Sequence, residues 1–564
     1  MKNTYVKNTI ILFVSMVISK VVGAVFKIPL TNILGGIGMG YYSTAYSLYT
    51  PVFAMTAAAI PTVIIKTVAD NIALHKFANA QKVLRTAVFT FGLIGIVGTV
   101  SILILAKPFA DTVAQSPQSV WGIIVIAPSV CMCCVSSVLK GYYEGCCNMM
   151  PTAVSQVAES VCRAVVGLGA SYFILDYGMK CFMNGDEIFG TIATNESSAI
   201  DIIMPYAAAG AVLAVTVSEL CALICLFVRK KFCKKVIDTT VGDTATDKAV
   251  TIAKELIKAC IPVSVAAIVV NLSSFIDLIT IPRCLNFALS CDSEYFRTCF
   301  SNIINSQGGA VRLANFMYGS YTGLSWTMFM LIPSFTAMFG RSALPQIASA
   351  WTLGNKKDFE RKVTMVLRSN FVIGFPLYLG LSAMSRQVLD FLFSGRQQEV
   401  GVSALPLFIL GLGGVFLTLS STFISIFQVI GRSDLPIKLM LPGCAVKLIL
   451  NVFTISIPEI NINGAAVSTV VMYAVVSLGG YLALENVTGI DFHIIKRMCV
   501  PLISGTICAV AAHFTYFFTA ERMSKVISLF MAIGASGIIY IILLIIFNEI
   551  NTKSLLNLQK RKNY

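Results

Sequence analysis

The chain has 564 residues, of which 56% are hydrophobic and 12% are charged, and its mean hydropathy is +0.81. Soluble proteins carry about 25% charged residues, so this composition excludes a soluble multidomain protein and indicates many membrane spans. The net charge of +15 does not require a nucleic-acid partner. Lys and Arg gather in the cytoplasmic loops of membrane proteins, and the sequence shows no basic groove interleaved with aromatic residues.

Apolar stretches of about 20 residues, the length that one membrane-crossing helix needs, recur from one end of the chain to the other. We predict an all-α polytopic membrane protein with about 14 transmembrane helices. The predicted spans are 8–28, 41–65, 84–106, 119–139, 151–175, 204–228, 256–281, 318–340, 367–385, 402–430, 437–457, 463–484, 495–518 and 526–548. Because Lys and Arg are concentrated in alternate loops, we expect both termini to be cytoplasmic.

The chain contains an internal duplication. Residues 141–163, GYYEGCCNMMPTAVSQVAESVCR, are echoed by residues 428–451, QVIGRSDLPIKLMLPGCAVKLILN, with Arg163 aligned to Lys447. Each half holds six predicted spans, and an even number returns the chain to its starting side, so the halves are parallel repeats about an axis along the membrane normal. We predict a six-helix lobe at 1–235, a second at 236–490, and two further helices with a basic tail at 491–564.

Basic residues within the predicted first span form the first candidate site. Lys20 and Lys27 are seven residues apart, so they share one helix face, and Gly23 between them lets another group approach. Such a cationic stripe suits an anionic ligand such as a phosphate or pyrophosphate. The alternative for Lys27 is that its ammonium extends to the outer membrane interface.

The duplicated segment supplies two further basic candidates. Glu159 and Arg163 are four residues apart on one helix face, where they can bind a ligand or simply neutralise each other. Lys447 has Gly443 at the position that corresponds to Glu159, so it has no carboxylate in its own helix. It must find another partner, face water or meet a ligand, which makes it the stronger substrate-binding candidate of the repeated pair.

Two acidic residues within predicted spans are candidates for ion coupling. Asp277 lies in the seventh span, where it can pair with Lys20 across the two halves or bind a coupling Na⁺ or H⁺. Glu219 in the sixth span is a weaker candidate of the same kind, and Glu159 joins them as either a coupling residue or one half of a structural pair.

No constellation for catalysis is visible. The chain lacks the GxxxxGK[ST] motif of P-loop ATPases, and none of its three histidines has a partner at metal-ligand spacing. We therefore expect no cofactor, no metal site and no enzymatic activity. Most of the 17 cysteines lie in apolar runs, where they act as small hydrophobes. Cys284, Cys291 and Cys299 share a polar loop and can be either free thiols or disulfide-bonded.

Four motifs together resemble a known family: ISKVVGAVFKIPLTNILG at 18–35, GYYSTAYSLYTPVFAMTAAAIPTVIIKTVAD at 40–70, NMMPTAVSQVAESVCR at 148–163 and LPQIASAWTLGNKKDFERKV at 344–363. Their order and spacing resemble the polysaccharide-transporter branch of the multidrug/oligosaccharidyl-lipid/polysaccharide exporter superfamily. Within it they are similar to the stage V sporulation B proteins and the bacterial lipid II flippases.

The resemblance implies two six-helix lobes around a central cavity, two additional helices and a location in the bacterial plasma membrane. It implies a flippase that moves an undecaprenyl-pyrophosphate-linked oligosaccharide or peptidoglycan precursor from the inner to the outer leaflet. The lipid II flippases hold the pyrophosphate with basic residues on the first helices, and Lys20 and Lys27 occupy such places here, as Lys rather than Arg. Membrane lipids and cell-wall synthesis enzymes are the expected partners. The alternatives are a cation-coupled multidrug exporter and a non-transporting scaffold for cell-wall or spore-envelope synthesis.

Overall fold

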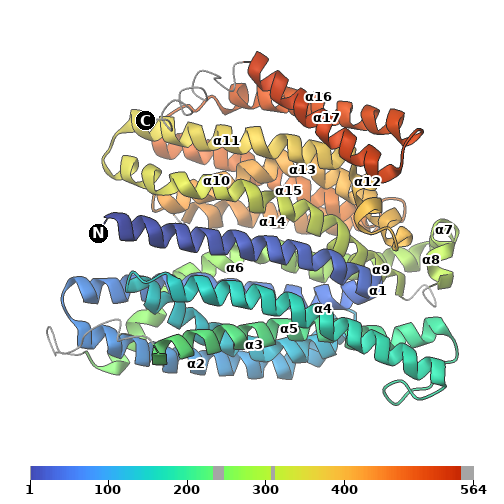
Figure 1. Cartoon of the computed structure of the whole chain (residues 1–564), viewed down its shortest axis with the longest axis horizontal. Helices are drawn as coiled ribbons and strands as arrows, with labels where there is room; N and C mark the ends of the chain where they lie inside the picture. Colours follow the sequence, from blue (N-terminus) through green and yellow to red (C-terminus); the bar gives the residue numbers. More distant parts are fainter. Residues whose placement is uncertain (1, 233–246, 307–311, 433, 548–564) are drawn as a thin grey trace. The chain divides into compact units, whose positions relative to one another are not determined.

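The computed structural model describes residues 2–232, 247–306, 312–432 and 434–547 (Figure 1). The described residues are almost entirely helical, which agrees with the membrane composition, because a bilayer offers no water to satisfy backbone N–H and C=O groups and a helix pairs them internally. The predicted lobe boundary after residue 235 and the basic C-terminal tail lie outside the described residues.

The α-helices are α1 Lys2–Ala73, α2 Phe77–Pro108, α3 Val120–Gly145, α4 Met150–Asn184, α5 Glu196–Phe232, α6 Ala249–Cys291, α7 Ser293–Cys299, α8 Ser301–Ser306, α9 Leu313–Ser320, α10 Trp326–Thr352, α11 Lys356–Ala383, α12 Ser385–Leu392, α13 Gln397–Val429, α14 Asp434–Ile455, α15 Asn463–Thr488, α16 Ile494–Ala520 and α17 Lys525–Ile546. Two π-helical turns, Phe109–Val113 and Tyr321–Ser325, and a short 3₁₀ turn, Pro117–Ser119, complete the helical elements.

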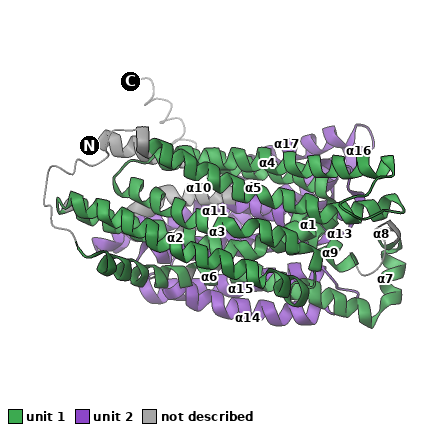
Figure 2. Ribbon diagram, turned by 90° about the horizontal axis from the view of Figure 1, so that it is seen from below, with its two compact units in different colours: residues 1–323 green, residues 324–564 purple. Residues whose placement is uncertain are grey.

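The chain forms two compact units, unit 1 at Met1–Gly323 and unit 2 at Leu324–Tyr564 (Figure 2). In unit 1, α1 packs against α3, α4, α5, α6 and α9, while α4 lies along α5 and α2 along α3. In unit 2, α13 packs against α11 and α15, α14 lies along α15, and α16 contacts α11 and α17. The two units are defined by contacts within the fold, whereas the predicted lobes, 1–235 and 236–490, are defined by the sequence repeat. The division into these two lobes stays a prediction.

Among the described residues, twelve helical stretches are long and apolar enough to cross a membrane. The first, Val14–Ile72, has 59 residues, enough for more than one crossing at about 20 residues each. It changes direction at Gly35, whose φ of 59° and ψ of −171° lie in a region that a residue with a Cβ rarely adopts. The all-α polytopic fold is confirmed, and the total of fourteen crossings stays a prediction.

Two segments that we predicted as loops are largely helical. In the predicted loop at 176–203, α4 continues to Asn184 and α5 already begins at Glu196. In the predicted loop at 283–317, α6 continues to Cys291 and is followed by three short helices. The prediction was wrong here because hydropathy marks only the apolar part of a helix, and a helix does not have to end where its apolar part ends.

The three cysteines of the second segment are free thiols. Cys284 lies within α6 and is buried, whereas Cys291 and Cys299 are exposed at the ends of α6 and α7. The structure thus favours the free-thiol alternative for these three residues.

Candidate functional site

The first feature of the site is an ion-pair triad in unit 1. Glu159 on α4 accepts from both flanking cations, with Oε1 2.8 Å from an Arg163 guanidinium nitrogen and Oε2 3.2 Å from Lys140 Nζ. The helical spacing of four residues brings Glu159 and Arg163 together, as predicted, and α3 supplies Lys140 across the Gly145–Met150 turn. The side chains of these three residues are 12–24% exposed, so the triad lies at a partly open position. Its two cations and one carboxylate give the triad a net positive charge.

A second polar layer lies deeper, on α5. Arg163 Nε donates to Ser218 Oγ at 3.3 Å, and Ser136 Oγ donates to Glu219 Oε2 at 3.2 Å. Glu219 is completely buried. The neighbouring positions Ser218 and Glu219 therefore link α5 to α4 and to α3 respectively, which ties three helices of unit 1 together through polar side chains.

The N-terminal part of α1 lies against the same region of α4. Ser19 Oγ donates to the Gln156 carbonyl oxygen at 3.2 Å, and a Cβ added at Gly167 would meet the Phe26 ring at 2.8 Å. The stretch of α1 from Ser19 to Phe26 thus runs beside the stretch of α4 from Gln156 to Gly167, which contains Arg163.

The predicted cationic stripe lies on this part of α1. Lys20 is exposed and Lys27 is half-buried. A Cβ added at Gly23 would meet no heavy atom of the described residues within 4 Å, so the space beside Gly23 is open. A ligand needs such space to approach Lys20 and Lys27. We refer to Lys20, Lys27 and Arg163 as the α1–α4 cation strip.

Asp277, the acidic candidate on α6, is 6% exposed and lies near Tyr318 of α9. The structure therefore places it inside unit 1, as expected for a functional or paired carboxylate within a span. Its pairing with Lys20 and its role in ion binding stay predictions.

Lys447, the candidate of the second repeat, lies on the buried face of α14 in unit 2. It is completely buried, and its ammonium lies 5.9 Å from the centre of the Trp326 ring on α10, a geometry in which the ring face attracts a cation. One turn further on, Asn451 accepts a hydrogen bond from Ser468 of α15. A ligand can therefore reach Lys447 only if the helices around it separate.

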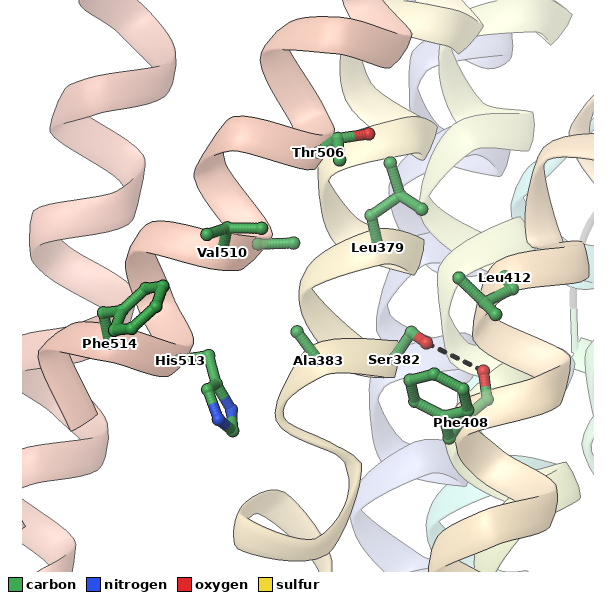
Figure 3. Close-up of a pocket in the computed structure, with 10 residues that line it drawn as sticks. Leu379, Ser382, Ala383, Phe408, Leu412, Thr506, Val510, His513 and Phe514 are labelled. Atoms are coloured by element: carbon green, nitrogen blue, oxygen red, sulfur yellow. Dashed lines mark hydrogen bonds between the residues drawn. The ribbon is translucent and has the colours of Figure 1, made fainter. Parts of the chain in front are cut away.

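Unit 2 also contains an apolar groove of about 380 Å³ between α11, α13 and α16 (Figure 3). Leu379 and Ala383 line it from α11, Leu412 from α13, and Val510 and Phe514 from α16, with His513 at one end. The Ser382 hydroxyl donates to the Phe408 carbonyl oxygen at 2.8 Å, so this lining hydroxyl is already satisfied. The groove suits a hydrocarbon chain rather than a polar ligand.

Sequence reasoning missed Lys140, Ser136 and Trp326. We ended the predicted fourth span at residue 139, so Lys140 counted as a loop charge. A signal was available, since Ser136 and Lys140 are four residues apart and share a helix face. The Trp326 contact has no such signal, because Trp326 and Lys447 are far apart in sequence and meet only through packing.

The sequence of this chain is similar to those of known proteins. A family model described as Polysaccharide biosynthesis protein matches residues 5–351. Stage V sporulation protein B of Bacillus subtilis (strain 168) is 24% identical over 98% of this chain and 97% of that protein. Lipid II flippase MurJ of the same organism is 20% identical over 96% of this chain and 95% of that protein.

Solved structures show the same fold. Lipid II flippase MurJ in an inward closed conformation has a TM-score of 0.64 at 12% identity, over 96% of this chain and 99% of that chain. A multidrug resistance MATE family transporter of the MOP superfamily, in an inward-facing conformation, has a TM-score of 0.62 at 14% identity, over 85% of this chain and 96% of that chain. The chain belongs to the polysaccharide biosynthesis protein family, whose model matches more than half of its residues.

Proposed function

We propose that this protein is a flippase that moves an undecaprenyl-pyrophosphate-linked oligosaccharide or peptidoglycan precursor from the inner to the outer leaflet of a bacterial plasma membrane. The observation that carries the proposal is the α1–α4 cation strip, in which Lys20, Lys27 and Arg163 occupy neighbouring stretches of two packed helices beside open space at Gly23. Membership of a family related to a lipid II flippase supports a lipid-linked substrate.

The strip would act by charge. A pyrophosphate carries several negative oxygens, and ammonium and guanidinium groups bind them through short, charge-assisted hydrogen bonds. Lys supplies mobile point charges and Arg supplies a planar fork, so Arg163 would orient the head group and the two lysines would neutralise it. The proposed transport cycle is alternating access by two six-helix lobes, with fourteen crossings and both termini in the cytoplasm.

The apolar groove of unit 2 offers a place for part of the lipid chain. Its lining from α11, α13 and α16 is almost entirely hydrocarbon, so a lipid chain can leave the bilayer for this groove without losing an apolar environment. Holding the chain in protein while the charged head group crosses would keep the substrate attached throughout the cycle.

A cation-coupled multidrug exporter is the second candidate. The fold that this chain shares with a MATE family transporter and the buried carboxylates Glu219 and Asp277 favour it. The basic character of the α1–α4 cation strip opposes it, because a cationic drug would be repelled by Lys20, Lys27 and Arg163.

Reconstituted liposomes distinguish the two. Fluorescent undecaprenyl-pyrophosphate sugar is placed in the membrane, and a membrane-impermeant reductant reports which leaflet holds the label. We expect the protein to accelerate exchange of this lipid and to leave a cationic dye, tested in parallel, untransported. Transport of the dye without exchange of the lipid would overturn the flippase proposal and favour the exporter.

A further inference from the structure

Glu219 is a buried carboxyl group that the proposed flippase function leaves unused. It is 0% exposed and its Oε2 accepts one hydrogen bond from Ser136 at 3.2 Å, while its Oε1 has no hydrogen-bond partner among the described residues. A carboxylate normally accepts several hydrogen bonds, and a buried charge is costly unless it is paired. Glu219 is therefore incompletely satisfied as a carboxylate.

A second unsatisfied polar atom lies close by. The hydroxyl of Tyr49 on α1 is buried and has no hydrogen-bond partner among the described residues, and Tyr49 lies near Glu219 and Cys133. Glu219 and Tyr49 thus each present a buried oxygen atom that no described protein group satisfies, which is rare among buried polar atoms.

The ionisable groups facing Glu219 come from three helices. They are Cys133, Cys134 and Lys140 on α3, Glu159 and Arg163 on α4, and Tyr49 on α1. Both cations make their ion pairs with Glu159 and not with Glu219. Glu159 thus forms ion pairs with both cations, whereas Glu219, which lies one layer deeper, accepts a hydrogen bond from the Ser136 hydroxyl.

We propose that Glu219 binds and releases a proton, and that this proton is the ion that drives transport. In the protonated form an O–H bond forms at Oε1, the charge disappears and the triad keeps its present pairing. On release the proton returns to water, and the carboxylate so formed attracts Arg163 or Lys140 away from Glu159. The coupling to transport rests on the proposed function, whereas the proton site itself does not.

A proton fits this place better than a metal cation. In the part of the chain that the structure describes, no group of three or more His, Cys, Asp or Glu side chains is arranged to hold a metal ion. Two fixed cations, Lys140 and Arg163, already lie beside the carboxyl groups and would repel a third. A proton adds to the carboxyl oxygen itself and needs no coordination shell.

Arg163 connects the proton site to the α1–α4 cation strip. Its guanidinium bonds Glu159 through one nitrogen and Ser218, the neighbour of Glu219, through another. A pyrophosphate that draws Arg163 toward Lys20 and Lys27 would remove a positive charge from the vicinity of Glu219. Substrate binding and proton occupancy are thereby linked through one side chain.

Infrared difference spectroscopy on the purified full-length protein tests the proton site without any lipid substrate. A protonated carboxylic acid has a C=O stretch distinct from that of a carboxylate, and a titration that begins above about pH 6, where ordinary Asp and Glu side chains are already ionised, follows its loss. We expect wild type to show one such band that Glu219→Gln removes, and that Ser136→Ala shifts in frequency because the hydrogen bond to Oε2 is lost. The matched control Glu255→Gln, at an exposed position of α6, should retain the wild-type band.

The proposal is overturned if the titrating band survives in Glu219→Gln, or if wild type has no titrating carboxyl band in a range where the protein stays folded. A pH gradient across liposomes then tests the coupling: it should accelerate lipid exchange by wild type and not by Glu219→Gln. Absence of lipid exchange in wild type, with the infrared band present, would contradict the flippase proposal and leave the proton site standing.

Discussion

At the scale of single residues, we propose that the α1–α4 cation strip determines what the protein binds. Two interpretations of Lys27 are open: it binds pyrophosphate, or its side chain reaches the membrane interface. In the structure Lys27 is half-buried. The two readings differ in what removing its charge would do, because an interfacial lysine contributes little to ligand binding, whereas a charge-assisted hydrogen bond contributes about 1.5–3 kcal/mol.

We predict that Lys27→Ala weakens binding of a fluorescent pyrophosphate-linked lipid by about 10- to 100-fold, the equivalent of about 1.5–3 kcal/mol. Lys27→Arg keeps the charge and should stay within a few-fold of wild type. Equilibrium titration in detergent measures both, with Lys180→Ala, which removes an exposed ion pair on α4, as the control. Unchanged affinity in Lys27→Ala would assign this side chain to the interface.

Glu159 holds two cations, so its removal should be costly. We predict that Glu159→Gln lowers the free energy of unfolding by about 3 kcal/mol, because Lys140 and Arg163 lose their shared countercharge at a mostly buried position. Thermal and denaturant unfolding in detergent measure the change. Asp176→Asn removes an exposed pair of the same spacing on the same helix and should cost well under 1 kcal/mol. Equal effects of the two substitutions would contradict this account of the triad.

The residues of the site differ in how far sequence predicts them. The Glu159–Arg163 pair follows from local helical spacing, and the two side chains form an ion pair in the structure, while their role stays a prediction. Lys140 joins through a helix–helix contact, and Lys447 meets the Trp326 ring through the tertiary packing of unit 2. Such contacts depend on which faces of distant helices meet, and a single sequence does not encode that in any local pattern.

At the scale of helices, glycine contacts set how closely neighbours approach. A Cβ added at Gly319 of α9 would overlap the Gly36 carbonyl oxygen and the Gly40 backbone nitrogen of α1. Backbone atoms cannot rotate away as a side chain does. The α1–α9 contact in unit 1 is thus possible because position 319 has no side chain.

We predict that Gly319→Ala destabilises the protein by about 1–3 kcal/mol, the usual cost of overpacking. Gly401→Ala on α13 is the matched control. An added Cβ there meets no heavy atom within 4 Å, so the substitution should be neutral or stabilise the helix by up to about 1 kcal/mol. Unfolding of the two variants in the same detergent measures the difference, and a harmless Gly319→Ala would show that α9 does not pack on α1 so closely.

The groove between α11, α13 and α16 can be tested by filling it. We predict that Thr506→Trp slows exchange of the long-chain lipid by roughly tenfold, the equivalent of about 1.4 kcal/mol, because the indole ring occupies the space that the lipid chain would fill. A short-chain analogue with the same head group should be transported as by wild type. Ile507→Trp, at an exposed neighbouring position outside the groove, is the control. Equal slowing of both lipids by Thr506→Trp would argue against a chain-binding groove.

The helices themselves were largely predictable, because an apolar run of bilayer length has few other structures open to it. The ends of these helices could not be predicted. α4 and α6 continue past the apolar residues, where helix and loop have similar composition. The bend at Gly35 was predicted only as a break between two spans, since sequence does not show whether a helix stops or turns.

At the scale of the whole chain, the two predicted repeats differ in chemistry. Arg163 in unit 1 is partly open and paired with Glu159, whereas the corresponding Lys447 in unit 2 is fully buried beside Trp326. Gly443, which corresponds to Glu159, instead packs α14 against Val476 of α15. The structure therefore favours unit 1 as the place where an anionic head group first binds, and Lys447 stays a predicted binding residue that needs a rearrangement to act.

The most direct test of the central claim is the initial rate at which liposomes containing wild type or Lys20→Ala exchange undecaprenyl-pyrophosphate sugar between leaflets. Lys20 is exposed, so the substitution removes a charge without leaving a cavity. We predict rapid exchange by wild type and at least roughly tenfold slower exchange by Lys20→Ala, for equal amounts of folded protein. Equal rates would contradict the assignment of the α1–α4 cation strip as the pyrophosphate site.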